Sequence, residues 1–513
     1  MGKIVHIIQH FCRAGADRAM LALAKYSARL GNWQHQIVSL VPAQIEAIAL
    51  ARQAEIEVVS APSRRELDER MTQSDIVHVH FWNNPELYQL FQSDLPSCRL
   101  LLWIHTAGDS LPQIITRDLI DYADFVVTSS AYSYELPVFQ TLPDGIRQLK
   151  TTNIYSGADY DRLVGILPKS HSTFNIGYLG TVDFAKMHPN YISMSSSIDI
   201  PDVKFIVVGT GRAHKIIERQ AAKLGIGICN RFQIQTFVED IRSFFEILDV
   251  FGYPLCENNY STAELVLQEA MYAGVPPVIF AYGGAQKTVI DNETGLIVNN
   301  EGEYKEAIEY LYNYPQERQR LSENCKKYAR DRFGAENTAK QFNQLYDRLL
   351  KFPKRSRGAL FPHSTPLSGA ELFCHSIGEA GRDFITSMEL TNIEEMLTVE
   401  NRIAALPEAG SDSGGGLLHY RNAYKSDPYL RLWSGLILQY RGQNTKAIFE
   451  FQQAIKLGLS HWRVYWYLAR STVKIGAFPW AKKALRKVIE LEPNFKEAKQ
   501  MLHCIEDKSD FNI

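Results

Sequence analysis

The chain has 513 residues, of which 45% are hydrophobic and 22% are charged, and its formal net charge at pH 7 is −2. The near-neutral charge excludes a general electrostatic attraction to nucleic acid or anionic lipid, and the hydrophobic content is sufficient for several globular cores. Seven scattered cysteines without a CxxC pair favour a reducing compartment and argue against a zinc site.

The N-terminus begins directly with an apolar strand at residues 3–8 and has no signal-peptide pattern. No apolar run reaches the roughly 18 to 20 residues that a membrane-spanning helix needs. We therefore expect a soluble, cytoplasmic protein whose contact with the inner face of a membrane is at most peripheral.

The first 350 residues alternate short apolar strands with amphipathic helices. Strands are predicted in the segments KIVHII, HQIVSLV, DIVHVHF, RLLLWIH, DFVVTSS, FNIGYLG, VKFIVVG, RFQIQTF, DVFGYPL and VPPVIF. Continuous Val/Ile/Leu runs are typical of parallel strands buried on both faces. Because about ten strands exceed one six-stranded unit, we predict an α/β fold of two Rossmann-like domains facing a cleft, at residues 1–165 and 166–350.

A third, all-helical part is expected after the two sheets. Residues 351–415 are interpreted as a partly helical linker, in which the basic run at 351–357 is a solvated segment or, less favoured, a weak contact with a lipid surface. In residues 416–513, Gly442 recurs 34 positions later as Gly476. This period resembles the tetratricopeptide repeat, which implies a protein partner or self-association.

The stretch STAELVLQEAMYAGVPPV at residues 261–278 predicts a buried helix that carries two carboxylates. Glu264 fits a capping box with Ser261, whereas Glu269 lies in mid-helix and needs a partner, either a protein cation or the hydroxyl groups of a ligand. A second feature is the small-residue turn Ala14-Gly15-Ala16-Asp17-Arg18 before a helix, where backbone amides can approach an anion.

These features together resemble the GT-B glycosyltransferases of the retaining, family-4-like kind (glycosyl transferases group 1). The resemblance covers roughly residues 1 to 350 and consists of several weak matches in the correct order. The matching segments are Ala14–Arg18, Asp75–His80, Ile104–His105, Ala123–Ser130, Ile154–Asp159, Gly180–Lys186, Glu269–Pro276 and Asp291–Val298.

The resemblance implies a site for the diphosphate and the ribose of a nucleotide-sugar donor. Lys186 matches a diphosphate cation of the family, and Glu269 matches the glutamate that meets the ribose hydroxyls. The family's other cation is replaced by Thr181, and its first glutamate by Ser261. Glu264 either substitutes for that first glutamate or only caps the helix, and Lys287 stands where the family often has Glu.

The implied reaction is transfer of a sugar from a nucleoside-diphosphate sugar, of UDP or GDP type, to the hydroxyl of a polysaccharide, glycolipid or protein, with retention and without a metal or another cofactor. His105 faces the donor sugar in the family, where it could donate to a sugar hydroxyl or support the oxocarbenium charge. Catalytic roles are predicted for His105, Lys186 and Glu264. Substrate contacts are predicted for Ala14, Gly15, Gly180, Thr181, Phe237, Val238, Ser261, Thr262, Ala263, Leu265 and Glu269.

Two other functions remain open. The replacements at Thr181, Ser261 and Lys287 fit a catalytically silent adaptor in which the helical repeats do the work. A sugar-nucleotide epimerase is the less favoured alternative. Neither the donor sugar nor the acceptor can be read from the sequence.

Overall fold

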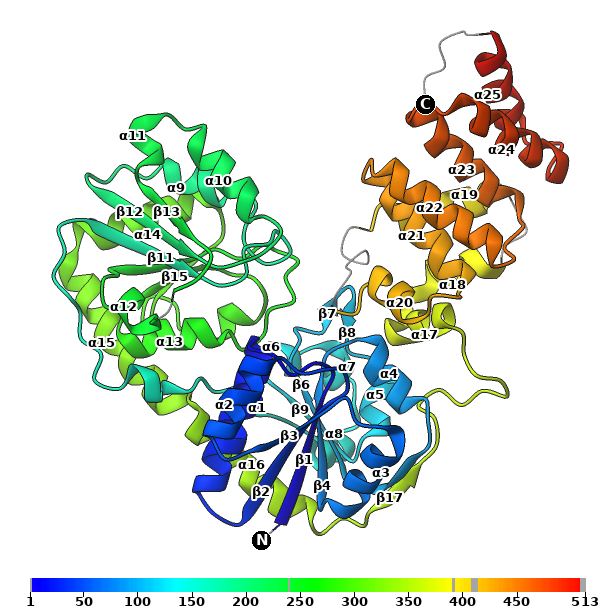
Figure 1. Ribbon diagram of the computed structural model, residues 1–513. Helices are drawn as coiled ribbons and strands as arrows, with labels where there is room; N and C mark the ends of the chain where they lie inside the picture. The colour runs from blue at the N-terminus through cyan, green and yellow to red at the C-terminus, as the bar shows by residue number, and fades with distance from the viewer. Residues whose placement is uncertain (1, 239, 390–392, 407–413, 508–513) are drawn as a thin grey trace. The chain divides into compact units, whose positions relative to one another are not determined.

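The computed structural model describes residues 2–238, 240–389, 393–406 and 414–507, and these form two compact units. The first unit comprises Met1–Trp82, Asp94–Ser110 and Arg117–Arg357. The second comprises Asn83–Ser93, Leu111–Thr116 and Gly358–Ile513. Figure 1 shows the two parallel sheets of the first unit in blue to green and the helices of the second in yellow to red, apart from the blue α4 (Pro85–Phe91).

The N-terminal sheet of the first unit has seven parallel strands in the order β10-β9-β6-β4-β1-β2-β3. Its strands are β1 (Gly2–Ile8), β2 (Trp33–Ser39), β3 (Glu57–Ser60), β4 (Ile76–Phe81), β6 (Leu100–Ile104), β9 (Phe125–Thr128) and β10 (Thr151–Asn153). Its helices are α1 (Gly15–Arg29), α2 (Ile45–Gln53), α3 (Arg64–Gln73), α5 (Arg117–Tyr122), α6 (Ala131–Tyr134), α7 (Pro137–Gln140) and α8 (Asp144–Lys150).

The second sheet of this unit has six parallel strands in the order β13-β12-β11-β14-β15-β16. The strands are β11 (Phe174–Leu179), β12 (Val203–Val208), β13 (Phe232–Gln235), β14 (Val250–Tyr253), β15 (Pro277–Phe280) and β16 (Leu296–Val298). The helices are α9 (Tyr191–Ser196), α10 (His214–Ala222), α11 (Ile226–Cys229), α12 (Ile241–Phe245), α13 (Leu265–Ala273), α14 (Glu301–Asn313) and α15 (Pro315–Arg332). The prediction of two Rossmann-like domains is confirmed.

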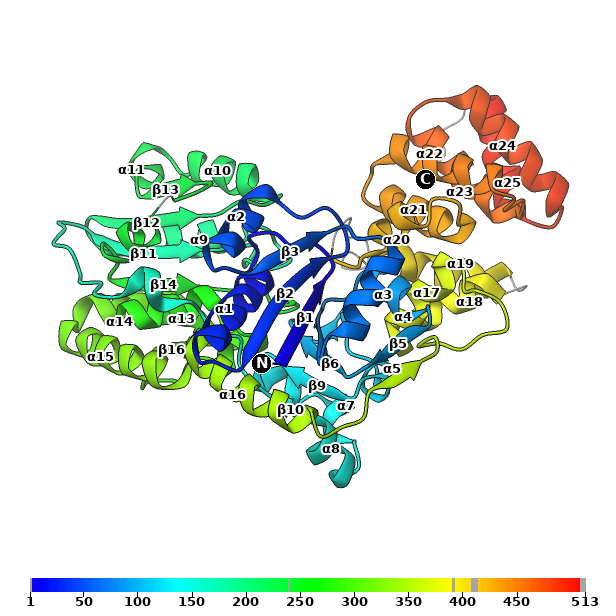
Figure 2. The same ribbon diagram turned by 60° about the horizontal axis from the view of Figure 1, so that its bottom comes forward.

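A long helix, α16 (Ala335–Leu349), leaves the second sheet and returns to the first (Figures 1 and 2). Its residues Ala339, Phe342 and Tyr346 share a buried cluster with Ile4 of β1 and Trp103 of β6. The helix therefore covers one face of the N-terminal sheet with side chains that come from the far end of the unit.

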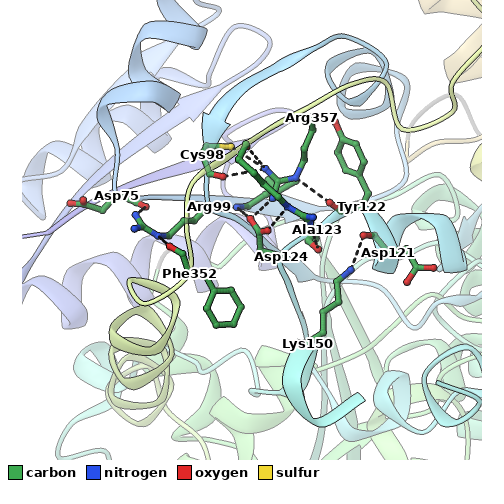
Figure 3. Close-up of polar contacts among 12 residues, drawn as sticks. Asp75, Cys98, Arg99, Asp121, Tyr122, Ala123, Asp124, Lys150, Phe352 and Arg357 are labelled. Atoms are coloured by element: carbon green, nitrogen blue, oxygen red, sulfur yellow. Dashed lines mark hydrogen bonds and ion pairs between the residues drawn. The ribbon is translucent and has the colours of Figure 1, made fainter. Parts of the chain in front are cut away.

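The basic run after α16 is ordered against the N-terminal sheet and is not a solvated segment (Figure 3). Strand β17 (Arg355–Arg357) pairs with β5 (Leu95–Cys98), and both Arg355 and Arg357 form ion pairs with Asp124. The Arg99 guanidinium donates 2.6 Å to the carbonyl oxygen of Phe352. Interpretation of this run as a solvated linker is wrong for its last three residues, because β17 pairs with β5 and its two arginines share Asp124, whereas Lys351 is exposed.

The second unit is helical, and Figure 2 shows its last helices stacked in succession. Its elements include α4 (Pro85–Phe91), α17 (Gly369–Ser376), α18 (Arg382–Glu389), α19 (Ile393–Ala404), α20 (Leu417–Ala423), α21 (Pro428–Tyr440), α22 (Asn444–Lys456), α23 (Trp462–Lys474), α24 (Phe478–Leu491) and α25 (Lys496–Asp507). Within the ranges described above, no helix is long and apolar enough to cross a membrane.

The period of 34 seen in the sequence reappears in the helices of this unit. Helix α23 begins 34 residues after α21, and α24 begins 34 residues after α22, from their first residues 428, 462, 444 and 478. Gly442 and Gly476 end equivalent helices with φ of +71° and +74°. Both turns therefore use the left-handed conformation that glycine adopts without strain.

Candidate functional site

The site is built around the first turn of α13, which differs from the predicted capping box. The helix begins at Leu265, and Glu264 before it has φ of +41° with no side-chain bond to the helix amides. A left-handed conformation at a residue other than glycine costs roughly 1 kcal/mol. The capping prediction for Glu264 is therefore wrong, and another interaction must hold this carboxylate.

Lys186 and Tyr253 are the partners of Glu264. The Lys186 ammonium lies 3.1 Å from Oε2 of Glu264, and the Tyr253 hydroxyl donates to the same oxygen at 2.5 Å. Burial acts to raise the pKa of Glu264, but Lys186 and Tyr253 outweigh it and hold this pKa below its usual value. Burial likewise acts to lower the pKa of Lys186, and the Glu264 charge raises it instead. Both groups are therefore ionised at neutral pH.

The loop that carries Lys186 is held rigidly by backbone contacts. A Cβ on Gly209 would lie 1.8 Å from the carbonyl oxygen of Gly180, and a Cβ on Gly211 would lie 2.2 Å from that of Val182. Only glycine fits at 209 and 211, so the loops after β11 and β12 pack backbone to backbone. This close packing fixes Gly180, where an added Cβ would lie 3.4 Å from the Tyr253 hydroxyl, and the next residue, Thr181, is exposed.

Glu269 is fully buried in α13, and of its two predicted kinds of partner the protein cation is present. Its Oε1 accepts from Arg18 of α1 at 2.5 Å and also from Arg162. Its Oε2 is buried and has no hydrogen-bond partner among the residues that the structure describes. A buried carboxylate oxygen without a partner is costly. Two protein cations thus bind one oxygen of Glu269, and the other oxygen faces no protein donor in the described ranges.

His105 follows β6 and lies against the residues around α13. Its Nδ1 is 3.4 Å from the Ser156 hydroxyl, and the Ser156 carbonyl oxygen accepts from the Gln268 amide at 2.8 Å. Burial lowers the pKa of His105 to about 3, so its ring is neutral at pH 7. A neutral ring can donate or accept a hydrogen bond but cannot supply a positive charge.

The residues just before α13 contact the N-terminal domain. The Thr262 hydroxyl donates to Ser130 at 2.7 Å, and the Ala107 amide donates to the Tyr260 carbonyl oxygen at 3.1 Å. Ser261 and Ala263 are buried, and Leu265 packs against the N-terminal core. A Cβ on Gly284 would lie only 1.9 Å from the Thr262 carbonyl oxygen, which explains the glycine in the adjoining loop.

Other predicted site residues lie in exposed positions. Ala14 and Gly15 form the exposed start of α1, and Phe237 is 62% exposed on the loop after β13. Val238 packs partly against the C-terminal core. None of the contacts in the described part of the chain joins Phe237 or Val238 to Lys186.

Three residues of the site were not selected from the sequence. Arg18 stands in the turn that the sequence analysis did single out, whereas Arg162 lies near the predicted domain boundary at residue 165 and Tyr253 lies inside a predicted strand. Their side chains meet Glu264 and Glu269 only through the fold. Lys287, a departure from the family, forms an ion pair with Glu135 at 2.7 Å.

The two parallel-sheet domains define the GT-B architecture, and comparisons with known proteins agree. Residues 161–328 match the family "Glycosyl transferases group 1", and this segment contains Lys186, Glu264 and Glu269. Over this segment the chain is similar to that family.

Among curated proteins, the chain is 24% identical over 327 residues to the D-inositol 3-phosphate glycosyltransferase of Corynebacterium urealyticum, covering 56% of this chain and 74% of that protein. It is 26% identical over 186 residues to the capsular polysaccharide biosynthesis glycosyltransferase CapM of Staphylococcus aureus, covering 35% of this chain and 48% of that protein. Both relatives align with less than two thirds of this chain.

Among solved structures, HepE of Anabaena in complex with UDP-glucose superposes with a TM-score of 0.56 at 18% identity, covering 68% of this chain and all of that one (100%). The pneumococcal O-GlcNAc transferase GtfA in complex with UDP and GlcNAc has a TM-score of 0.53 at 10% identity, with coverage of 68% and 100%. At these identities the likeness establishes the fold.

Proposed function

We propose that this protein is a glycosyltransferase that moves a sugar from a nucleoside-diphosphate donor to an acceptor hydroxyl. The observation that carries the proposal is the pairing of Lys186 with Glu264, beside a buried Glu269 oxygen that has no partner, inside the segment that matches the family. A cation for a diphosphate and an acceptor for ribose hydroxyls are what such a donor requires. Related proteins that contain UDP or UDP-glucose support a UDP-type donor.

In the proposed reaction the bond between the anomeric carbon and the diphosphate oxygen breaks, and a bond from that carbon to the acceptor oxygen forms. The acceptor's proton passes to the leaving diphosphate, so no protein base is needed. Lys186 and the amides at the start of α13 would stabilise the charge on that leaving group. Attack from the face that the diphosphate leaves gives retention, and no metal is assigned a role.

The helical unit is proposed to bind a protein segment or a second copy of the chain. The 34-residue offset between helix pairs α21–α22 and α23–α24 supports a tetratricopeptide-like stack. Such stacks present extended surfaces to peptides or proteins. A protein acceptor would be recruited in this way, or the enzyme would dock into a polysaccharide assembly complex.

The test is thermal stabilisation by UDP, GDP and ADP and their sugar conjugates, followed by chromatographic detection of sugar release with and without a chelator. A ligand at 100 times its Kd adds about 2.7 kcal/mol to the free energy of unfolding. We expect a shift with one nucleotide series that the Glu269→Ala variant loses. Absence of a shift with every nucleotide would contradict the enzyme proposal and favour the silent adaptor.

A further inference from the structure

Four histidines form a continuous hydrogen-bonded row along one face of the N-terminal sheet. His105 Nε2 lies 3.0 Å from His80 Nδ1, and His80 Nε2 lies 2.9 Å from His6 Nδ1. His6 Nε2 lies 2.8 Å from His35 Nδ1, and His35 Nε2 lies 2.8 Å from the Ser27 hydroxyl. The row therefore joins the candidate site after β6 to His35 on β2 and Ser27 on α1.

The chain follows from the strand registers. His6 of β1 is opposite His78 of β4, and alternate residues of a strand share a face, so His80 lies on the same face. His80 is opposite Trp103 of β6, which places His105, two residues later, on that face as well. His6, His80 and His105 are buried, and His35 is partly exposed.

All four imidazoles are neutral at pH 7. Burial lowers the pKa of His105 and His35 to about 3, and it lowers the pKa of His6 and His80 well below the ordinary value. A neutral imidazole carries one N–H, so it donates from one nitrogen and accepts at the other. When every ring in a row uses both of its nitrogens, all the rings must therefore donate in the same direction along the row.

The far end of the row selects that direction. The Ser27 hydroxyl donates to Oδ1 of Asn343 on α16 at 2.5 Å. A hydroxyl has one proton, so Ser27 must accept from His35, whose proton then sits on Nε2. By the same rule His6, His80 and His105 each carry the proton on Nε2.

We infer that His80, His6 and His35 are positioning residues that hold His105 in the Nε2–H tautomer and turn its Nδ1 lone pair toward a hydroxyl of the bound sugar. The identity of that hydroxyl rests on the proposed function, but the tautomer does not. The Ser156 hydroxyl makes only a long contact of 3.4 Å with this Nδ1 atom. The family resemblance allowed His105 to donate to a sugar hydroxyl, whereas the histidine row makes its Nδ1 an acceptor.

A buried metal is the competing explanation, because His6, His78 and His80 offer nitrogens within 4.8 Å of one another and Nε2 of His78 has no hydrogen-bond partner in the described part of the chain. The His6 and His80 nitrogens are 2.9 Å apart, which is a normal hydrogen-bond distance. Two nitrogens on one tetrahedral zinc, each about 2.0 to 2.1 Å from it, would lie farther apart than this. A shared proton therefore fits this pair better than a metal.

The test is nitrogen-15 NMR of the full chain labelled at histidine, with metal analysis of the same sample. Protonated and unprotonated ring nitrogens resonate far apart, so the spectrum reports each tautomer directly. We expect His105, His80, His6 and His35 as Nε2–H tautomers and no bound metal. An Nδ1–H tautomer at His105, or one equivalent of metal that shifts the His78 and His80 signals, would overturn the inference.

Variants at the partly exposed Asn343 test the direction of the row without opening the core. Asn343→Leu removes the acceptor for Ser27 and should move His105 toward the Nδ1–H tautomer, whereas Asn343→Asp keeps an acceptor and should preserve the wild-type spectrum. His78→Phe, beside the row but bonded to Tyr346, should also leave the tautomer of His105 unchanged. An unaltered His105 tautomer in Asn343→Leu would contradict the inference.

Kinetics add a readout that depends on the proposed function. Sugar transfer should fall about tenfold in Asn343→Leu and stay within about twofold of wild type in Asn343→Asp, as expected for loss of one hydrogen bond. If the protein transfers no sugar, the NMR result still decides the tautomer. Failure of the proposed function and failure of this inference are thus distinguishable.

Discussion

Arg18 of α1 places its Nη2 2.5 Å from Oε1 of Glu269 in α13, although the two residues are 251 positions apart. Arg162 contacts the same oxygen, and the Glu269 side chain is fully buried while the two arginines are 35% and 39% exposed. The two arginines therefore share one buried carboxylate oxygen and together offset the cost of burying Glu269.

This sharing predicts strong non-additivity. Arg18→Ala and Arg162→Ala should each lower the free energy of unfolding by about 1 kcal/mol, and the double variant by about 3 kcal/mol or more, because only the double change leaves a buried charge unpaired. Urea unfolding measures the three values. In a Glu269→Gln background the coupling between the two arginine substitutions should vanish, so that their losses add. Additive losses of equal size in wild type and in this background would refute the shared-oxygen arrangement.

Lys186 is predicted to be essential for binding the diphosphate. Lys186→Met should reduce UDP affinity more than tenfold, since it removes the charge-assisted contact. It also leaves the buried Glu264 carboxylate without its cation, so we expect a stability loss of about 2 to 4 kcal/mol. The second change Glu264→Gln should reverse this loss. Calorimetric titration of the restored double variant isolates binding from folding. Lys204→Met, at a partly exposed lysine of β12, serves as the control, and full UDP affinity in the double variant would disprove the role.

Glu264 is predicted to compete with the diphosphate for the Lys186 ammonium. Glu264→Gln leaves the cation unneutralised, so UDP should bind about tenfold more tightly while the unliganded protein loses about 1 to 3 kcal/mol of stability. Glu264→Gly makes the same electrostatic change but removes the strain of the φ of +41°, and it should be the more stable of the two. Thermal unfolding with and without UDP gives both quantities. A loss of UDP affinity in both variants would instead assign Glu264 a direct contact with the donor.

The sequence predicted the two sheets well and the site only in part. Continuous apolar runs located ten strands correctly, whereas β3, β10 and β16 were missed because they are short and lie at or near sheet edges. Lys186 and Glu269 were found because each has a distinctive local context. Arg162 and Tyr253 were not, since nothing local marks a residue whose role depends on a partner far along the chain.

The capping prediction failed for a related reason. The pattern Ser261-Thr262-Ala263-Glu264 has the spacing of a capping box, but the carboxylate gains more from a buried ammonium and a tyrosine hydroxyl than from a helix amide. The histidine row shows the reverse case. Its members alternate along neighbouring predicted strands, so the shared face could have been inferred, but the strand order and register were needed to join them.

Close packing in the helical repeats makes Gly435 sensitive to the smallest enlargement. A Cβ at this position would lie 2.4 Å from the Phe451 ring. Gly435→Ala should therefore destabilise the helical unit by about 1 to 3 kcal/mol. Combining it with Phe451→Leu should recover part of that loss, as followed by thermal denaturation of the full chain. Additive losses in the double variant would show that the two residues do not meet.

Asp17 is predicted to make stability depend on pH. Its carboxylate accepts from the Cys12 amide at 2.9 Å, yet burial raises its pKa from 3.8 to about 7. Because the folded protein holds this proton more tightly than the unfolded chain, the stabilisation is complete below about pH 3.8 and is lost as pH rises through 7. Asp17→Asn should remove this loss, so its advantage over wild type should grow between pH 4 and 7, to an upper limit of roughly 4 kcal/mol.

Asp161 is the matched control: burial acts to raise its pKa, but Lys25 and Tyr26 hold it at about 2, so Asp161→Asn should add no slope in this range. Urea unfolding at several pH values decides the matter, because a wild-type slope that persists in Asp17→Asn must come from another group.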